Sequence, residues 1–455
     1  MTTGEILSRH VLRDRFAVAM SEMYSEEIPA YSALVEMVGK QNVNARSKSS
    51  KQHVFPEVEA GLAYHGAIRL GSDEDLRMMR RAFALMGMQP VGYYDLSAAG
   101  LPVHSTAFRP ITTEAIELSP FRIFTSLLRL DMLEDDDLKH RINNILSTRE
   151  VFTPRVVELI EIAESRSGLT REQGEEFVLE LLETFRWRNE AHVSLDEYKV
   201  FDKSYRLLAD IVSFHGPHIN HLTVGSENID EAHKAIGSCG VHAKSSIEGP
   251  PKRQCPILLR QTAFKAIEET VMFPDGQGGN ELGSHTARFG EVEARGAALT
   301  PKGRALYDRL LAEAQASKDS GPEALQQAFA EFPDDWDMLR EKGLAYFRYR
   351  LAPPARGFSN DNHEAWDIDS LIDEGVIEVS PVRYEDFLPV SAAGIFRSNL
   401  GEDASVSVKG DSRKAEFEAS LGTPVLDPFE LYQAVETNSL SYCAQVLGIE
   451  IAYAA

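Results

Sequence analysis

The stretch YHGAIRLGS, residues 64–72, places a histidine and an arginine four residues apart in a short apolar run. If this run is a strand, His65 and Arg69 point to the same face, because successive side chains of a strand alternate between faces. Imidazole is a frequent metal ligand and a guanidinium pairs with carboxylates, so this face could hold a metal beside an anion. The simpler interpretation is that Arg69 pairs with a surface acid such as Asp73.

A second histidine-rich stretch, HGPHINH, covers residues 215–221. Gly216 and Pro217 disfavour a helix, so the spacing of the three histidines does not make a helical metal-binding pair. On an extended chain, His218 and His221 point to opposite faces. Taken alone, either could be a hydrogen-bonded core or loop histidine.

The third chemically suggestive stretch is RFGEVEARG, residues 288–296. The period of two places Glu291, Glu293 and Arg295 on one face of a strand. Two carboxylates on that face are costly to bury unless they are paired or bound to a metal. The alternative is a solvent-facing strand edge that carries a Glu–Arg pair.

An internal repeat links the first two stretches. Each runs from a strand through Gly-Ser, at Gly71 and Gly225, into an acidic helix start, a helix, a glycine and another strand. Aligning the two corners shifts the histidines by two residues, which keeps them on the same face of a strand. The repeat therefore selects His221 as the counterpart of His65 and predicts a shared cavity, although a repeat this short can also arise by coincidence.

Two histidines and one of the two glutamates would form a 2-His-1-carboxylate set. This set suits Fe(II) and leaves three coordination positions open for substrate and dioxygen. Zinc or manganese is chemically possible at the same residues, so the donor types alone do not select the metal.

The elements that must position these residues predict an α+β protein. Helical patterns, strand patterns and turn residues divide the chain into N-terminal helices, a first βαβββ-like module, a helical insertion, a second βαβββ-like module, and a helical and mixed C-terminal region that covers the site. The expected boundaries are 1–50, 51–118, 119–210, 211–300 and 301–455.

Composition narrows the function classes. The 455 residues include 47 Lys and Arg against 70 Asp and Glu, a formal net charge of −23, so we expect no nucleic-acid partner and no anionic membrane surface. The three cysteines form no CxxC motif, which disfavours a disulfide framework or a thiolate metal site. No leader and no long apolar run is seen, so a soluble, cytoplasmic protein is expected.

The duplicated modules, with a histidine from the first strand of each and a glutamate from the last strand of the second, resemble the vicinal oxygen chelate superfamily. The segment FGEVEAR also resembles the FLEIIQR-type segment of 4-hydroxyphenylpyruvate dioxygenases, whose glutamate binds the metal. This resemblance implies a curved sheet around a metal site and places the ligand at Glu291, with Glu293 as the runner-up.

More closely, YHGAIRLGS, HINHLT, RFGEVEARGAALTPKGRALYD and LPVSAAGIFRSNL are similar, in order and spacing, to the 2-oxoadipate dioxygenase/decarboxylase family along nearly the whole chain. That resemblance implies an Fe(II) enzyme of lysine catabolism that converts 2-oxoadipate and O2 into 2-hydroxyglutarate and CO2. The resemblance implies that His65, His221 and Glu291 hold the metal. It also implies that Arg69 holds the distal carboxylate of the substrate, and that Val390 and Ser391 contact the substrate.

Other interpretations stay open in the sequence. A redox-inert isomerase or lyase of the same superfamily would use a fourth protein ligand, and a dicarboxylate sensor would bind without consuming oxygen. His285 is a candidate hydrogen-bond partner on the Glu291 face, and His104 is expected to be structural or to line the cavity. The insertion and the C-terminal region are expected to cover the cavity, and an oligomer interface is an equally good use of them.

Overall fold

The structure is a computed structural model that describes residues 5–48, 55, 61–316, 321–353, 366–388 and 413–452. A seven-stranded sheet forms its centre, with the strand order β2-β3-β4-β1-β5-β9-β6. The antiparallel pair β1 and β5 joins two related modules in the middle of this sheet. The predicted α+β class with two modules in one sheet is confirmed.

The first module is a complete βαβββ unit. Its strands are β1 (Ala63–Leu70), β2 (Gln89–Asp95), β3 (Val103–Arg109) and β4 (Arg122–Leu128), and α3 (Asp73–Leu85) follows β1. The helix begins where predicted, because the Ser72 side chain accepts a hydrogen bond from the Asp75 amide and three acids occupy the first turn. The first strand pairs in parallel with the last, β4.

The strand β4 lies within 119–210, the range that the sequence predicts to be mainly helical. All seven residues of RIFTSLL are buried. A strand buried on both faces lacks the alternation of polar and apolar residues, so its periodicity does not distinguish it from a buried helix.

The second module follows the same plan with one difference. It contains β5 (His221–Gly225), α10 (Ile229–Ala235), β6 (Leu259–Ala263), β7 (Glu268–Pro274), β8 (Asn280–Thr286) and β9 (Phe289–Arg295). Strand β5 pairs in parallel with β9, as β1 does with β4. Strands β7 and β8, however, pair only with each other and leave the central sheet as a hairpin. Residues 241–249 form isolated bridges at Ala243 and Glu248, to Phe264 and Gln261.

Helices cover one face of the sheet. The long helices α1 (Arg9–Glu27) and α2 (Pro29–Lys48) contact β1, β5 and β9. The apolar residues of that face, such as Ile68, Leu222 and Val292, belong to one hydrophobic core with these helices. The intervening residues of the same strands point to the opposite face, where the polar site lies.

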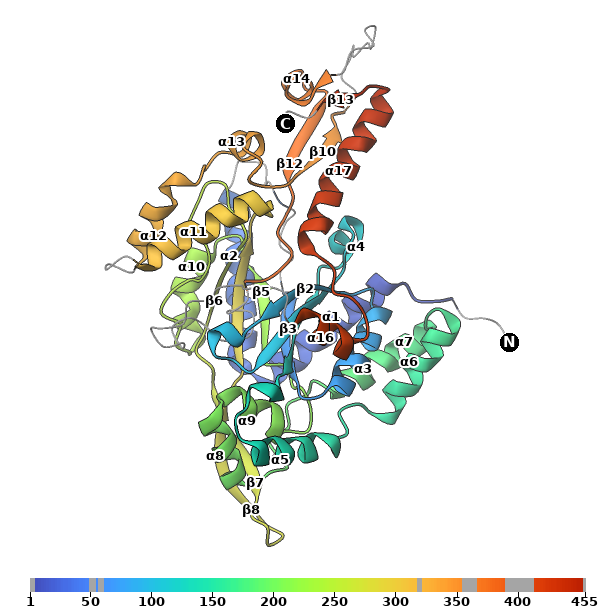
Figure 1. Cartoon of the computed structure of the whole chain (residues 1–455), viewed down its shortest axis with the longest axis vertical. Coiled ribbons are helices and arrows are strands. Elements are labelled where there is room, and N and C mark those ends of the chain that lie inside the picture. The colour runs from blue at the N-terminus through green and yellow to red at the C-terminus, as the bar shows by residue number, and fades with distance from the viewer. Residues whose placement is uncertain are drawn as a thin grey trace.

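The helical insertion packs beside the projecting hairpin. It consists of α5 (Asp136–Ser147), α6 (Pro154–Arg166), α7 (Arg171–Glu183), α8 (Leu195–Ser204) and α9 (Arg206–Ser213), after the short helix α4 (Thr113–Leu118). Capping boxes at Thr170 and Ser194 start α7 and α8. Figure 1 shows α8, α9 and the β7–β8 hairpin together at one end of the molecule.

Most of the C-terminal region lies toward the opposite end of the molecule in Figure 1, whereas α16 (Lys414–Leu421) lies beside the central sheet and packs against α3. Its elements are α11 (Pro301–Ala316), α12 (Pro322–Ala328), α13 (Trp336–Glu341), β10 (Phe347–Leu351), β11 (Trp366–Asp367), α14 (Ile368–Asp373), β12 (Ile377–Pro381), α16 (Lys414–Leu421), α17 (Pro428–Leu447) and β13 (Ile451–Ala452). After β12 the chain returns to the central sheet, and Tyr384 donates a backbone hydrogen bond to Gly296.

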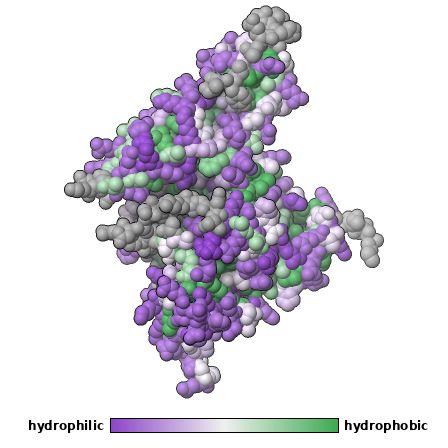
Figure 2. Space-filling model, viewed as in Figure 1, coloured by the Kyte–Doolittle hydropathy of each residue, from purple (hydrophilic) through white to green (hydrophobic). Residues whose placement is uncertain are grey.

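The face of the molecule in Figure 2 is dominated by hydrophilic residues, in keeping with the acidic composition. Within the described ranges, no helix has the length and apolar character needed to cross a membrane.

Candidate active site

Three neighbouring strands bring the predicted ligands together. His65 lies on β1, and the antiparallel register pairs it with Thr223 and pairs Ala67 with His221 on β5. The parallel register of β5 with β9 then places Glu291 opposite Thr223. The ring centroids of His65 and His221 are 5.6 Å apart, and all three candidate ligands are fully buried. The sheet therefore brings together the two histidines that the repeat predicts and the glutamate that the resemblance implies.

The donor atoms of the set converge. Nε2 of His65 lies 3.1 Å from Oε1 of Glu291, and Nε2 of His221 lies 4.0 Å from the same oxygen. The ligand atoms of the three residues all fall within 4.8 Å of one another. Thr223 and Gln261 donate hydrogen bonds to Glu291 Oε1 at 2.9 and 2.7 Å, and these two supporting residues were not found by sequence reasoning.

Glu293 has a different environment from Glu291. Its carboxylate pairs with Arg295 through two hydrogen bonds of 2.7 and 3.0 Å, and its Oε2 lies 2.8 Å from Nδ1 of His65. Burial alone would raise the pKa of Glu293, but Arg295 and His65 outweigh it and hold the pKa far below its usual range. Glu293 is thus an ionised residue that orients His65 from the side opposite to Glu291, with Nε2 turned toward the other ligands.

Unsatisfied buried atoms identify where a cation fits. Neither ring nitrogen of His221 has a hydrogen-bond partner among the described residues, nor does Oε2 of Glu291. Buried polar atoms without partners are rare and costly. Burial, followed by the charges of His65 and Arg69, lowers the pKa of His221 well below its usual value, so its ring is neutral and offers a lone pair. A divalent metal would satisfy one ring nitrogen of His221 together with the carboxylate of Glu291, and the donor set fits the group that the sequence predicts.

Arg69 lies beyond this cluster on the same strand. Its guanidinium pairs through Nη1 with Asp210 of α9, and its side chain is almost completely buried. The partner is therefore a buried carboxylate of the insertion rather than Asp73, which lies 3.7 Å from Arg77. The charge of Arg69 acts on His221, which places a fixed cation within electrostatic reach of the ligands.

Two other histidines of the sequence analysis lie outside the ligand set. His285 was a candidate partner on the Glu291 face, but its Nε2 lies 2.9 Å from Asp210 Oδ1, because β8 belongs to the hairpin and not to the central sheet. His104 packs against Phe417, with ring centroids 4.6 Å apart, and burial lowers its pKa to about 4, which agrees with a structural role. Val390 and Ser391 lie outside the described residues.

Aromatic rings border the ligand cluster. The ring of Phe387 packs edge-on against His65 at 4.8 Å, and the ring of Phe289 stacks on His221 at 4.7 Å. Both rings are buried. They limit water around the imidazoles and fix the ring orientations, which strengthens electrostatic interactions inside the site.

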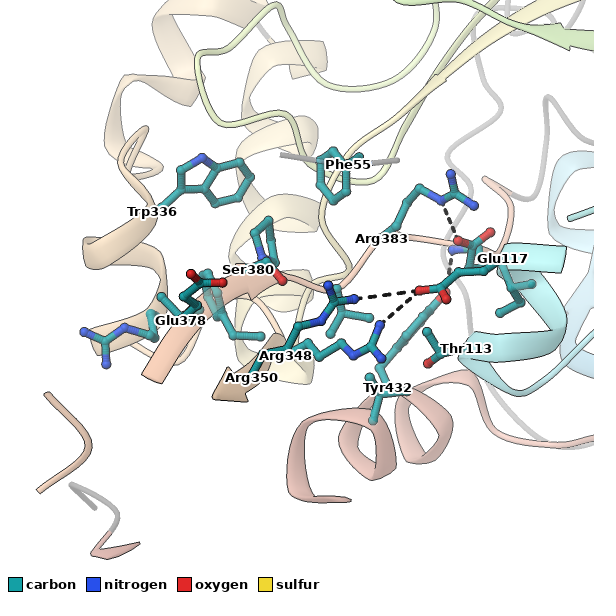
Figure 3. A pocket seen from close by; sticks show the side chains of 18 of the residues that line it. Phe55, Thr113, Glu117, Trp336, Arg348, Arg350, Glu378, Ser380, Arg383 and Tyr432 are labelled. Carbon is teal, nitrogen blue, oxygen red and sulfur yellow. Dashed lines mark hydrogen bonds and ion pairs between the residues drawn. The ribbon is translucent and has the colours of Figure 1, made fainter. Parts of the chain in front are cut away.

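A cavity of about 860 Å³ is lined in part by residues 377–383 and 385, which precede Phe387 in the chain. Figure 3 shows its charged lining, in which Arg348 and Arg350 both pair with Glu117, at 3.0 and 3.9 Å. Arg383 pairs with Glu385 at 2.6 Å. Its lining carries five arginines against four acidic residues, but no cluster of metal-ligand side chains among the residues described. The chemistry of the chain is concentrated in the smaller, buried cluster.

The chain is similar to known proteins along nearly its whole length. The family described as 2-oxoadipate dioxygenase/decarboxylase matches residues 16–399. A protein of Escherichia coli (strain K12) named 2-oxoadipate dioxygenase/decarboxylase is 47% identical over 439 residues, covering 95% of this chain and 97% of its own. A Pseudomonas putida protein of the same name is 46% identical over 469 residues, covering 99% of both chains. The crystal structure of the hydroxyglutarate synthase from Pseudomonas putida in complex with 2-oxoadipate is similar with a TM-score of 0.87 and 42% identity, over 98% of this chain and 100% of that one.

Proposed function

The chain belongs to the 2-oxoadipate dioxygenase/decarboxylase family, and we propose that it is an Fe(II) enzyme that converts 2-oxoadipate and O2 into 2-hydroxyglutarate and CO2. One observation carries the proposal: a fully buried cluster of two histidines and one carboxylate contains nitrogen and oxygen atoms that no described residue satisfies. A relative that binds 2-oxoadipate with the same fold supports the choice of substrate.

His65, His221 and Glu291 would hold the metal. When bound, Fe(II) supplies positions for the carboxylate and keto oxygens of the 2-oxo acid and for dioxygen. Glu293 keeps Nε2 of His65 turned toward the metal position, since its own carboxylate lies at Nδ1. Thr223 and Gln261 hold Glu291 through Oε1, while Oε2 has no hydrogen-bond partner among the described residues.

Arg69 would bind the distal carboxylate of the substrate. It lies four residues beyond His65 on β1, roughly 13 Å along the strand at about 3.3 Å per residue. Its side chain can lean back to pair with a carboxylate through parallel N–H···O bonds. The substrate would thus span the pocket between the ligand cluster and a fixed cation, while Phe387 and Phe289 restrict water near the ligands.

The proposed reaction balances without another oxidant or reductant. The terminal carboxyl group next to the keto carbon leaves as CO2, and the keto carbon becomes the new carboxylate with one atom of O2. The second oxygen atom forms the hydroxyl group on the adjacent carbon. Both atoms of O2 therefore end in 2-hydroxyglutarate.

The test is oxygen uptake by protein loaded anaerobically with Fe(II) and given 2-oxoadipate, with the product analysed by mass spectrometry after reaction under ¹⁸O2. We expect one O2 consumed per 2-oxoadipate and two labelled atoms in 2-hydroxyglutarate. Iron binding without oxygen uptake or change of the substrate would refute the oxygenase proposal.

A further inference from the structure

A buried polar network surrounds Asp210, and none of the proposed ligands belongs to it. One carboxylate oxygen, Oδ2, accepts from Arg69 Nη1 and from Asn220 Nδ2 at 3.1 Å. The other, Oδ1, lies 3.1 Å from His218 Nε2 and 2.9 Å from His285 Nε2. All five residues have buried or nearly buried side chains.

This cluster resembles a metal site only in composition. Asp210, His218 and His285 have ligand atoms within 4.8 Å of one another. Each oxygen of Asp210 already has two donors, which is the full capacity of a carboxylate. A cation bound there would also lie beside the positive charge of Arg69. The carboxylate of Asp210 therefore keeps no lone pair for a metal, although Oδ1 of Asn220 in the same network has no hydrogen-bond partner among the described residues.

The protonation states follow from the carboxylate. Burial would raise the pKa of Asp210, but Arg69 and His218 outweigh it and hold the pKa well below its usual range. An ionised carboxylate only accepts hydrogen bonds, so both histidines donate through Nε2. Nδ1 of His285 lies 2.8 Å from the hydroxyl of Tyr198, which ties the outer edge of the ring to α8. Asp210 is held in place by donors on several sides.

We propose that Asp210 is a positioning residue that sets the selectivity of the enzyme for 2-oxo dicarboxylates, because it holds the guanidinium of Arg69 toward the distal carboxylate. This inference rests on the proposed function. An arginine side chain has many rotamers, so fixing it before the substrate arrives reduces the entropy lost on binding. Asp210 also compensates the charge of Arg69 in the pocket before the anionic substrate binds.

The elements that supply the network give the insertion a role. Tyr198 comes from α8, Asp210 from α9 and His285 from the β7–β8 hairpin, and these elements pack together at one end of the molecule (Figure 1). The central sheet supplies Arg69 on β1. The insertion and the hairpin would thus orient one cation of the sheet and so determine which 2-oxo acids react.

The experiment compares 2-oxoadipate with 2-oxohexanoate, which has the same carbon chain but no distal carboxylate, in Fe(II)-loaded wild type and Asp210→Asn. We expect the ratio of kcat/KM for the two acids to fall by about tenfold or more in the variant, mainly through KM for 2-oxoadipate, as for loss of a charged hydrogen bond. Activity on 2-oxohexanoate and metal content should stay near those of the wild type. A general folding defect would lower both activities together.

A matched control is Asp75→Asn. Asp75 forms a comparable ion pair with Arg149 at 3.0 Å, and this pair also joins the first module to the insertion. Asp75 contacts neither Arg69 nor a proposed ligand. In Asp75→Asn, the ratio of kcat/KM for 2-oxoadipate to that for 2-oxohexanoate should not change. If Asp210→Asn does not fold, His285→Gln tests the same network, and a smaller fall of the ratio is expected.

An unchanged ratio in folded Asp210→Asn, or loss of a bound metal equivalent, would overturn the inference. If wild type binds 2-oxoadipate without turnover, the proposed function is refuted, but the inference about Asp210 is still testable by binding. Calorimetric titration of the two acids then decides, because Asp210→Asn should weaken 2-oxoadipate binding selectively. Equal weakening for both acids would again overturn the inference.

Discussion

Two buried clusters of this molecule each contain two histidines and one carboxylate, but they differ in whether the ligand atoms already have hydrogen-bond partners. His65, His221 and Glu291 include unsatisfied nitrogen and oxygen atoms, whereas Asp210 has donors on both oxygens from His218, His285 and other residues. Two histidines and a carboxylate at short distances are thus not enough to define a metal site. The distinguishing property is whether lone pairs remain for a cation.

The two clusters also have different structural origins. The first arises from β1, β5 and β9, which are adjacent in the duplicated sheet, so its geometry follows from strand register. The second joins α9 and the segment that follows it, which leads into β5, to the distant strand β8 of the projecting hairpin. A rigid sheet holds the proposed chemistry, while the added elements adjust a cation beside it.

Removing one histidine from each cluster should give the largest difference. We expect His221→Ala to lose stoichiometric Fe(II) and to lower oxygen uptake by about two orders of magnitude or more, since loss of a residue that only orients a ligand already costs 10–100-fold. His285→Ala should keep its metal equivalent. Metal analysis and oxygen-electrode rates check both variants, and equal metal loss in the two would remove the distinction between the clusters.

Asp210→Ala should give the largest loss of stability. It leaves the buried charge of Arg69 without its Asp210 partner, and breaking a buried ion pair from one side lowers the free energy of unfolding by about 3–5 kcal/mol. Urea denaturation of metal-free wild type and variant measures this directly. A difference below about 1 kcal/mol, as for an exposed pair, would contradict the network described here.

The same carboxylate predicts how stability depends on pH. The pKa of Asp210 is lower in the folded state than its unfolded value of about 3.9, so the folded state binds fewer protons in that range. Its stabilising contribution is therefore complete above about pH 5 and is lost as the pH falls through 3.9 toward the folded pKa. The acid side of the stability curve should be flatter in Asp210→Ala than in wild type.

Glu293→Gln tests the division of roles between the two glutamates. Glu293 lies at Nδ1 of His65, so we expect metal affinity to weaken by about 10–100-fold while binding is retained at saturating Fe(II). Glu291→Gln should lose binding at all accessible concentrations. Competition with a chelator of known affinity measures both constants, and the reverse order would exchange the assigned roles.

Much of the first cluster could be predicted from the sequence, because alternation on β1 and β9 and the repeat of the Gly-Ser corners place its residues on one face. The family, the fold class and the enzyme class are confirmed. Counting along the strand failed for His285, since β8 ends at Thr286 and leaves the sheet before β9 begins. Periodicity could not reveal the contact between Arg69 and Asp210, which joins residues 141 positions apart through an inserted helix.

The smallest expected effect comes from the outer edge of the second cluster. Tyr198→Phe removes the hydroxyl that lies 2.8 Å from Nδ1 of His285 but keeps the ring, which packs against Phe273 with centroids 5.0 Å apart. We expect a loss of about 1 kcal/mol in the free energy of unfolding, with an unchanged metal content and only a slight fall in the 2-oxoadipate to 2-oxohexanoate ratio. Urea denaturation and the paired kinetics measure these quantities. Since Asp210 keeps all four of its own donors in this variant, a large selectivity change would mean that Tyr198 acts on the pocket by a route other than His285.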